Sequence, residues 1–103
     1  MHLTITKFEV SPDLTVADLV RMFEQSTERY TRVPGLLAKH YYLGPGRRQA
    51  GGVYLWEDEA RAKAAQGAEF VEAIRQRFGS VPEVQAMYCP LSLDNVRRCV
   101  RTA

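Results

Sequence analysis

Two apolar runs around a glycine-rich turn constrain the fold of this chain more than any other feature. The first run is Leu36 to Leu43, bounded by Pro34-Gly35 and by Gly44-Pro45-Gly46, and the second is Val53 to Trp56, preceded by Gly51-Gly52. Aliphatic and aromatic runs flanked by glycine and proline predict two strands joined as a hairpin. Alternate residues are apolar on both sides of each run, so we expect both faces of the hairpin to be covered.

Breakers and apolar spacing predict six elements in the order strand, helix, strand, strand, helix, strand, followed by a short helix. We expect first a strand over residues 2–10, with a bulge or change of environment near its middle, and a helix over 16–30 capped by Thr15 or Asp13. The two hairpin strands follow, and then a helix that begins at Glu57 to Glu59, is interrupted at Gly67 and ends before Gly79. The last two elements are a strand over 83–89 and a short helix over 91–100.

This order is that of the ferredoxin-like α+β fold, βαββαβ, with a four-stranded antiparallel sheet and both helices on one face. We expect a single domain over residues 1–103, because 46 % hydrophobic residues suffice for one core of this size. The other face of the sheet would leave several hundred Å² of apolar surface in water, which soluble monomers rarely tolerate. The sequence therefore predicts a homodimer in which two sheets pack face to face.

Charge and composition argue against several classes of partner. The net charge is +2, with acidic and basic residues interspersed, so neither nucleic acid nor an anionic membrane is indicated. The first ten residues carry Lys7 and Glu9 in place of an uninterrupted apolar stretch, and we expect a cytoplasmic protein. In that compartment the two cysteines, Cys89 and Cys99, are expected to be reduced thiols.

A short set of motifs resembles a known family. Pro34-Gly35-Leu36 and Lys39, followed by the run Gly51 to Trp56 and by Glu57-Asp58, are similar to the dimeric α+β barrel superfamily, and within it to the antibiotic-biosynthesis-monooxygenase-like branch of small bacterial monooxygenases. The resemblance implies that the sheets of a dimer close into a barrel and that each subunit holds a pocket between sheet and helices. It further implies cofactor-independent monooxygenases, isomerases, cyclases and haem-degrading enzymes as relatives.

Aromatic and basic residues around the hairpin are the candidates for chemistry. A cofactor-independent oxygenase needs a base, a donor for the oxyanion and a dry pocket. His40 is the candidate base, because an imidazole titrates near neutral pH, and Tyr42 shares its strand face. Trp56, Tyr54 and Tyr30 are the candidate walls for a small aromatic substrate. Whether His40 and Tyr42 face the helices or the second subunit depends on the hairpin register, and packing roles for these residues stay open.

Other residues of the motif have plainer interpretations. Gly51-Gly52 is typical of a bulge or turn. Lys39 lies on the strand face opposite His40, and we expect its aliphatic stem to pack beneath an aromatic ring while its ammonium stays in water. Arg47 and Arg48 flank the hairpin tip, where arginines are usually solvated.

Three further classes of function are disfavoured or kept as alternatives. No set of residues has the spacing of a metal site, and the second helix lacks the histidine that haem-degrading relatives use, so we expect no metal and no cofactor. RNA-recognition modules share the element order, but the third strand lacks their stacking aromatics. The resemblance implies a function as a cofactor-independent monooxygenase on a small aromatic or enolisable compound, and a ligand-binding or structural dimer is the alternative.

Overall fold

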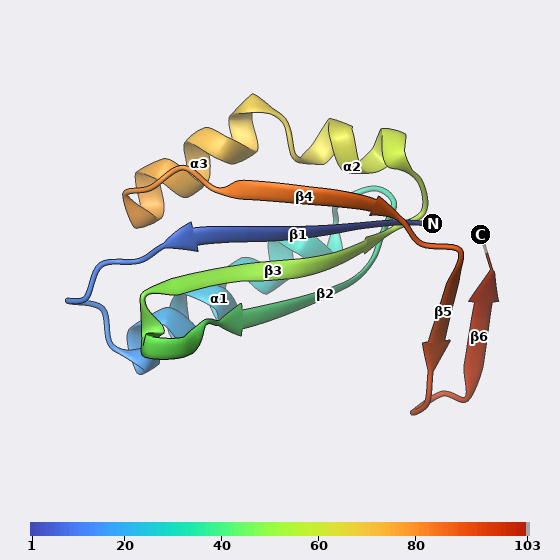
Figure 1. Cartoon of the computed structure of the whole chain (residues 1–103), viewed down its shortest axis with the longest axis horizontal. Coiled ribbons are helices and arrows are strands. Elements are labelled where there is room, and N and C mark those ends of the chain that lie inside the picture. Colours follow the sequence, from blue (N-terminus) through green and yellow to red (C-terminus); the bar gives the residue numbers. More distant parts are fainter. Residues whose placement is uncertain (103) are drawn as a thin grey trace.

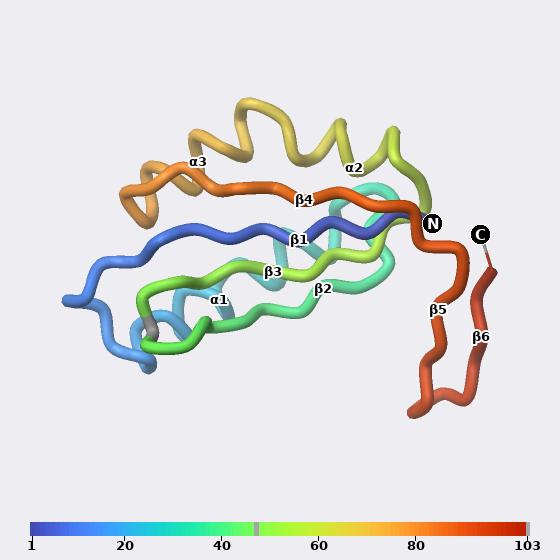
Figure 2. Tube along the Cα trace, in the orientation of Figure 1, coloured from blue at the N-terminus to red at the C-terminus, as the bar shows by residue number. Residues whose placement is uncertain are grey.

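Four strands form an antiparallel sheet in the order β2-β3-β1-β4 in this computed structural model (Figure 1). Residues 1–102 are described, except for the side chain of Arg47 (Figure 2). The elements are β1 (His2–Glu9), α1 (Val16–Thr31), β2 (Leu36–Leu43), the 3₁₀ turn η1 (Pro45–Arg47), β3 (Gln49–Trp56), α2 (Glu59–Ala65), α3 (Ala68–Phe78), β4 (Glu83–Tyr88), β5 (Leu91–Asp94) and β6 (Cys99–Thr102). The ferredoxin-like α+β fold is confirmed.

Local sequence explains where the helices begin and end. Thr15 caps α1 through a capping box with Asp18, in which each side chain accepts a hydrogen bond from the other residue's backbone N–H. Asp58 caps α2 by accepting from the N–H of Arg61 at 2.8 Å. Gly67 separates α2 from α3, and Gly79 ends α3 with a left-handed φ of 83°. The expected interruption at Gly67 is confirmed.

All three helices cover one face of the sheet, which we call the helix face. Phe8 and Ala50 pack there against Leu19 of α1, and Tyr54 and Trp56 pack against Ala62 of α2 and Phe70 of α3. The opposite, open face carries the half-buried Leu3 and Ile5 of β1 together with Val53 and Leu55 of β3. Of the two alternatives predicted for the middle of β1, the change of environment is confirmed and the bulge is wrong. β1 pairs with β3 without interruption, and its apolar residues lie on the open face at Leu3 and Ile5 and on the helix face at Phe8. The irregularity lies in β2 between Leu36 and Ala38.

The C-terminal segment forms a hairpin, so the helix predicted over residues 91–100 is wrong. β5 and β6 pair antiparallel as a separate two-stranded sheet, which projects from the end of the main sheet (Figure 1). The carboxylate of Asp94 accepts from the N–H groups of Val96 and Arg97, and Arg98 adopts a φ of 52°. This turn competes successfully with the helical spacing of Leu93, Val96 and Val100, because Asp side chains favour local turns over helix interiors.

Candidate active site between the sheet and the helices

Lys39 lies inside a group of three tyrosines on the helix face. Its Nζ is 3.3 Å from the ring centroid of Tyr30, 4.0 Å from that of Tyr41 and 4.8 Å from that of Tyr54. These rings come from α1, β2 and β3, and the register pairs Lys39 directly with Tyr54. In the part of the chain that the structure describes, no carboxylate forms an ion pair with Lys39.

This environment changes the protonation of Lys39. Burial lowers the pKa of its ammonium to about 7, and the positive charges of Arg29 and Arg77 act in the same direction. The faces of the three tyrosine rings favour the ammonium and so oppose the fall. An amine with a pKa near 7 is substantially neutral at neutral pH, and it can accept a proton as a general base.

The hydroxyls of the neighbouring tyrosines stay protonated at neutral pH. Burial raises the pKa of Tyr54 well above its ordinary value, and the side chain is only 2 % exposed. Burial also raises the pKa of Tyr41. The hydroxyl of Ser26 donates to the carbonyl oxygen of Phe23 at 2.8 Å, so the Tyr41 hydroxyl, 2.7 Å from Ser26 Oγ, is the donor of that pair. These phenols can therefore donate hydrogen bonds but do not act as bases.

Trp56 forms a fixed wall beside the tyrosines. It is fully buried, and its Nε1 donates to Thr4 Oγ1 at 3.0 Å. Its ring is stacked with that of Tyr54, with centroids 5.8 Å apart and an interplanar angle of 10°. A buried indole whose N–H has a partner is held in one orientation, so Trp56 gives Tyr54 a rigid support.

The two glycines of β3 make room for the side chains around them. A Cβ added at Gly52 would lie 2.9 Å from Tyr54 Cε1 and 3.2 Å from Lys39 Cε, and one added at Gly51 would lie 2.7 Å from the Tyr42 hydroxyl. Strand pairing continues through both residues. The interpretation of Gly51-Gly52 as a bulge or turn is therefore wrong, and close approach of neighbouring groups is the reason for glycine at both positions.

Two cavities meet at Tyr30. One, of about 260 Å³, lies between α1 and β2 and is lined by residues that include Tyr30, Lys39 and Tyr41. The other, of about 320 Å³, lies between α1 and the helices α2 and α3 and is lined by residues that include Tyr30 and Trp56. Their size is at the lower end of the range of small-molecule sites, which fits a compound with one or two rings.

The structure divides the predicted site residues between the two faces of the sheet. Tyr30, Tyr54 and Trp56 come together on the helix face, where they line the cavities or pack beside them. His40 and Tyr42 pair with Val53 and Gly51 on the open face. His40 is exposed, and the Tyr42 hydroxyl donates to the carbonyl oxygen of Thr6 at 2.7 Å. A compound beside Tyr54 and Trp56 therefore does not meet His40 of the same subunit.

Lys39, Arg29 and Arg77 lie at the site, although the sequence patterns did not predict them as site residues. The expectation that the Lys39 ammonium stays in water is wrong, because the tyrosine rings enclose it. One signal was available: Lys39 alternates with Tyr41 and Leu43, so a lysine occupies an apolar position of the strand. Arg29 and Arg77 directly precede Tyr30 and Phe78 in the apolar stripes of α1 and α3.

Three observations bear on metals, thiols and membranes. Within residues 1–102, no group of three or more His, Cys, Asp or Glu side chains is placed to hold a metal ion, and Cys89 and Cys99 are free thiols. None of the helices described is long and apolar enough to span a bilayer.

Comparison with known proteins identifies the family. The family model described as Putative mono-oxygenase ydhR matches residues 3–89, which is most of the chain and includes every strand of the main sheet. The chain therefore belongs to this monooxygenase-like family. None of the curated proteins compared with the chain matches it.

Solved structures with the same fold include oxygenases. A monooxygenase from the gene ActVA-Orf6 of Streptomyces coelicolor, in complex with nanaomycin D, has a TM-score of 0.64 at 20 % identity over 85 % of this chain and 86 % of its own. A mutant of SnoaB, a cofactor-independent oxygenase from Streptomyces nogalater, has a TM-score of 0.63 at 14 % identity over 89 % and 95 %. A protein of unknown function from Nitrosomonas europaea has a TM-score of 0.66 at 19 % identity over 84 % and 85 %. At these identities the likeness is one of fold.

Proposed function

We propose that the protein is a cofactor-independent monooxygenase that acts on a small aromatic or enolisable compound in the cavities around Tyr30. The observation that carries this proposal is the Lys39 amine, which has a pKa of about 7 and lies against three tyrosine rings. A base with this pKa, next to aromatic surfaces that can stack on a flat compound, is what proton abstraction from a phenol or an enolisable ketone requires.

The proposed reaction begins with transfer of a proton from the substrate to neutral Lys39. The resulting enolate or phenolate supplies the electrons that reduce O₂, so the proposal needs no flavin, haem or metal. A carbon–oxygen bond forms at the activated carbon, the oxygen–oxygen bond then breaks, and loss of water leaves a carbonyl group where a CH₂ group stood. One O₂ is consumed for each CH₂ group oxidised.

The surrounding groups have separate parts in this proposal. The Lys39 ammonium that forms on proton transfer lies beside the new anion and stabilises it electrostatically. The protonated hydroxyls of Tyr54 and Tyr41 cannot remove a second proton. The Tyr41 hydroxyl donates to Ser26 Oγ, so Tyr54 is the potential donor to an oxyanion. Trp56 fixes the position of Tyr54 by stacking, and the orientation of a substrate ring would follow from that.

Oxygen uptake by the purified protein tests the proposal. A polyhydroxynaphthalene should support uptake without added flavin, haem or metal, and Lys39→Met should lower the rate about 10² to 10⁴-fold if Lys39 is the general base. Lys63→Met is the matched control, because it removes an exposed lysine of α2 that pairs with Glu59 and lies outside the proposed site. Full activity in Lys39→Met would contradict the assignment of the base. Binding without oxygen uptake in the wild type would instead favour a ligand-binding dimer.

We also propose that the open face forms a homodimer. Leu3, Ile5, Val53 and Leu55 form an apolar surface on the central strands, which a second copy would cover. His40 and Tyr42 lie on the same face, so a catalytic role for them stays a prediction that would act across this interface. Light scattering should give twice the subunit mass at micromolar concentration, since obligate interfaces of this kind bury about 2,000 Å² or more. A folded monomer under those conditions would contradict the dimer.

A further inference from the structure

Two arginines lie at the cavity between α1 and α3 without a carboxylate partner. Arg29 of α1 and Arg77 of α3 both line this cavity and the small space of about 30 Å³ that adjoins Lys39. Neither forms an ion pair with any residue in the described part of the chain. Their placement on separate helices puts two positive charges on opposite sides of one opening.

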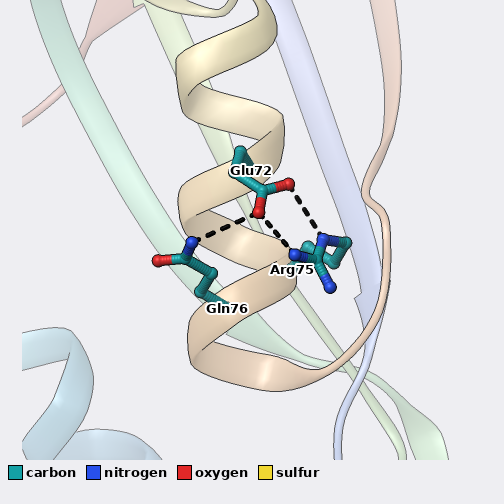
Figure 3. Close-up of polar contacts among 3 residues, drawn as sticks. All are labelled: Glu72, Arg75 and Gln76. Carbon is teal, nitrogen blue, oxygen red and sulfur yellow. Dashed lines mark hydrogen bonds and ion pairs between the residues drawn. The ribbon is translucent and has the colours of Figure 1, made fainter.

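Arg75 shows how an arginine on the same helix behaves when its partner is present. Its guanidinium donates to both carboxylate oxygens of Glu72, and Gln76 Nε2 donates to one of them at 3.2 Å (Figure 3). This network neutralises Arg75 locally. Arg77, two residues further on, faces the cavity instead, and its charge is not neutralised in this way.

The charge around the cavity is positive on balance. Among the described residues that line it, Glu69 carries the one negative charge, and Arg29 and Arg77 carry two positive charges. When Lys39 is protonated, its ammonium adds a further positive charge in the adjoining space. Both arginines act on Lys39 electrostatically, which shows that their fields reach the proposed base. An anion in this cavity would therefore be attracted by Arg29 and Arg77 while Lys39 is neutral.

Gln66 supplies an independent indication of a ligand. It lines the same cavity, and among the described residues neither its amide nitrogen nor its amide oxygen has a hydrogen-bond partner, although both atoms are buried. A buried amide without partners is unfavourable. Both atoms are shielded from solvent as they stand, so the amide would bond to a polar substituent of a bound molecule after turning toward the cavity.

The aromatic walls define the rest of the ligand. Tyr30, Trp56 and Phe70 line the cavity. Trp56 is fully buried, so the partly exposed ring of Tyr30 is the flat surface on which an aromatic ring can stack. We propose that this cavity binds an aromatic compound that carries a carboxylate, and that Arg29 and Arg77 hold the carboxylate while Gln66 bonds to a polar substituent. This inference rests on the proposed function for the reaction at Lys39 and deepens it by naming the substrate as an anionic aromatic acid.

A matched pair of probes separates charge from shape. 3-Hydroxy-2-naphthoate and 3-hydroxy-2-naphthamide differ only in the acidic group, and their binding is measured by calorimetry under nitrogen so that no oxidation contributes. Trp56 is the single tryptophan of the chain, so its fluorescence reports binding in the cavity. The acid should bind about 10-fold or more tightly than the amide, because hydrogen bonds between guanidinium and carboxylate are charge-assisted.

Variants then assign the preference to residues. The double variant Arg29→Gln/Arg77→Gln should weaken binding of the acid about 10-fold or more and leave the amide unchanged, whereas Arg75→Gln, on the same helix but paired with Glu72, should change neither. All three arginines are exposed, and thermal unfolding checks that the variants fold. Equal binding of acid and amide, failure of both to bind, or an equal effect of Arg75→Gln would overturn the inference.

The outcomes for the two proposals are separable. Selective binding of the acid without oxygen uptake from any tested compound would contradict the monooxygenase proposal and leave the anion site standing. Oxygen uptake that the double variant leaves unchanged, without preference for the acid, would contradict the anion site and leave the role of Lys39 standing.

Discussion

The two faces of the β2–β3 hairpin have opposite characters, although they alternate residue by residue along the same strands. On the helix face, Lys39 and Tyr41 lie opposite Tyr54 and Gly52 and line enclosed space. On the open face, His40 and Tyr42 lie opposite Val53 and Gly51, and His40 is exposed. A shift of one residue in strand register therefore decides which titratable side chain enters the cavity, because successive side chains point to opposite faces.

The difference extends to how each face stabilises the protein. Most of the helix face is covered within one chain, since three helices cover Phe8, Tyr54 and Trp56, while Val84 and Tyr88 of the edge strand β4 stay exposed on that face. The open face leaves apolar residues of four strands without cover from the same chain, among them Met87 at 39 % exposure. Stability from the helix face should therefore be independent of protein concentration, and stability from the open face should depend on it.

The largest expected effect concerns the helix face. Trp56→Ala should lower the free energy of unfolding by about 3–5 kcal/mol, because it removes a fully buried ring and leaves a cavity. Leu55→Ala changes the neighbouring residue on the open face. At low protein concentration it should lower the free energy of unfolding by less than Trp56→Ala does, and this loss should grow as the protein concentration rises. Urea unfolding at two concentrations measures both. Equal, concentration-independent losses would show that the two faces do not differ as described.

The two glycines allow a second comparison across the sheet. Gly51→Ala should destabilise by about 3 kcal/mol, because its Cβ would lie 1.8 Å from the backbone oxygen of Thr6. Gly52→Ala should destabilise less, since its nearest neighbours are side-chain atoms of Tyr54 and Lys39, and it should lower activity by displacing them. Thermal unfolding together with oxygen uptake distinguishes the two variants. A milder effect at Gly51 than at Gly52 would be the contradictory result.

Removal of the buried amine should stabilise the protein. The folded-state pKa of Lys39, about 7, is below the unfolded value near 10.4, so the unfolded chain binds more protons between these limits and wild-type stability rises with pH there. Lys39→Met should therefore gain about 1–3 kcal/mol at pH 6, and the gain should shrink between pH 7 and 10. Denaturant unfolding at pH 6, 8 and 9.5 measures it. A gain that is constant with pH would mean that Lys39 titrates normally.

The smallest effect on folding is expected from the C-terminal hairpin. Leu91, Leu93, Val96 and Val100 are 58 to 94 % exposed, and the Cα radius of gyration of 14.1 Å exceeds the roughly 13 Å typical of this length. Truncation after Pro90 should change the free energy of unfolding at low concentration by less than about 0.5 kcal/mol and should weaken the dimer. Sedimentation checks the association. An unchanged dimer would show that the hairpin lies outside the interface.

The regular elements of this fold could be predicted because their signals are local. Thr15 and Asp58 cap helices, and Gly67 and Gly79 interrupt or end them, so each boundary depends on a few neighbouring residues. The prediction for residues 91–100 was wrong because their apolar spacing suits a helix. The turn at Asp94 and Arg98 and the pairing of β5 with β6 instead produce a hairpin. In a segment of this length, the 3.6-residue period of a helix and the 2-residue period of a strand cannot be told apart from the few apolar residues present.

Local patterns were enough to predict the βαββαβ order, the apolar two-sided hairpin and the aromatic residues Tyr30, Tyr54 and Trp56 near the site. The position of Lys39 in the cavity, with His40 outside it, depends on how the helices pack on the sheet. The physical reason is that the pKa of an amine depends on burial and on charges from elements far apart in the chain: Arg29 of α1 and Arg77 of α3 act on Lys39 of β2. The distances from Lys39 to these two arginines are set when the helices pack on the sheet, and no local pattern encodes them.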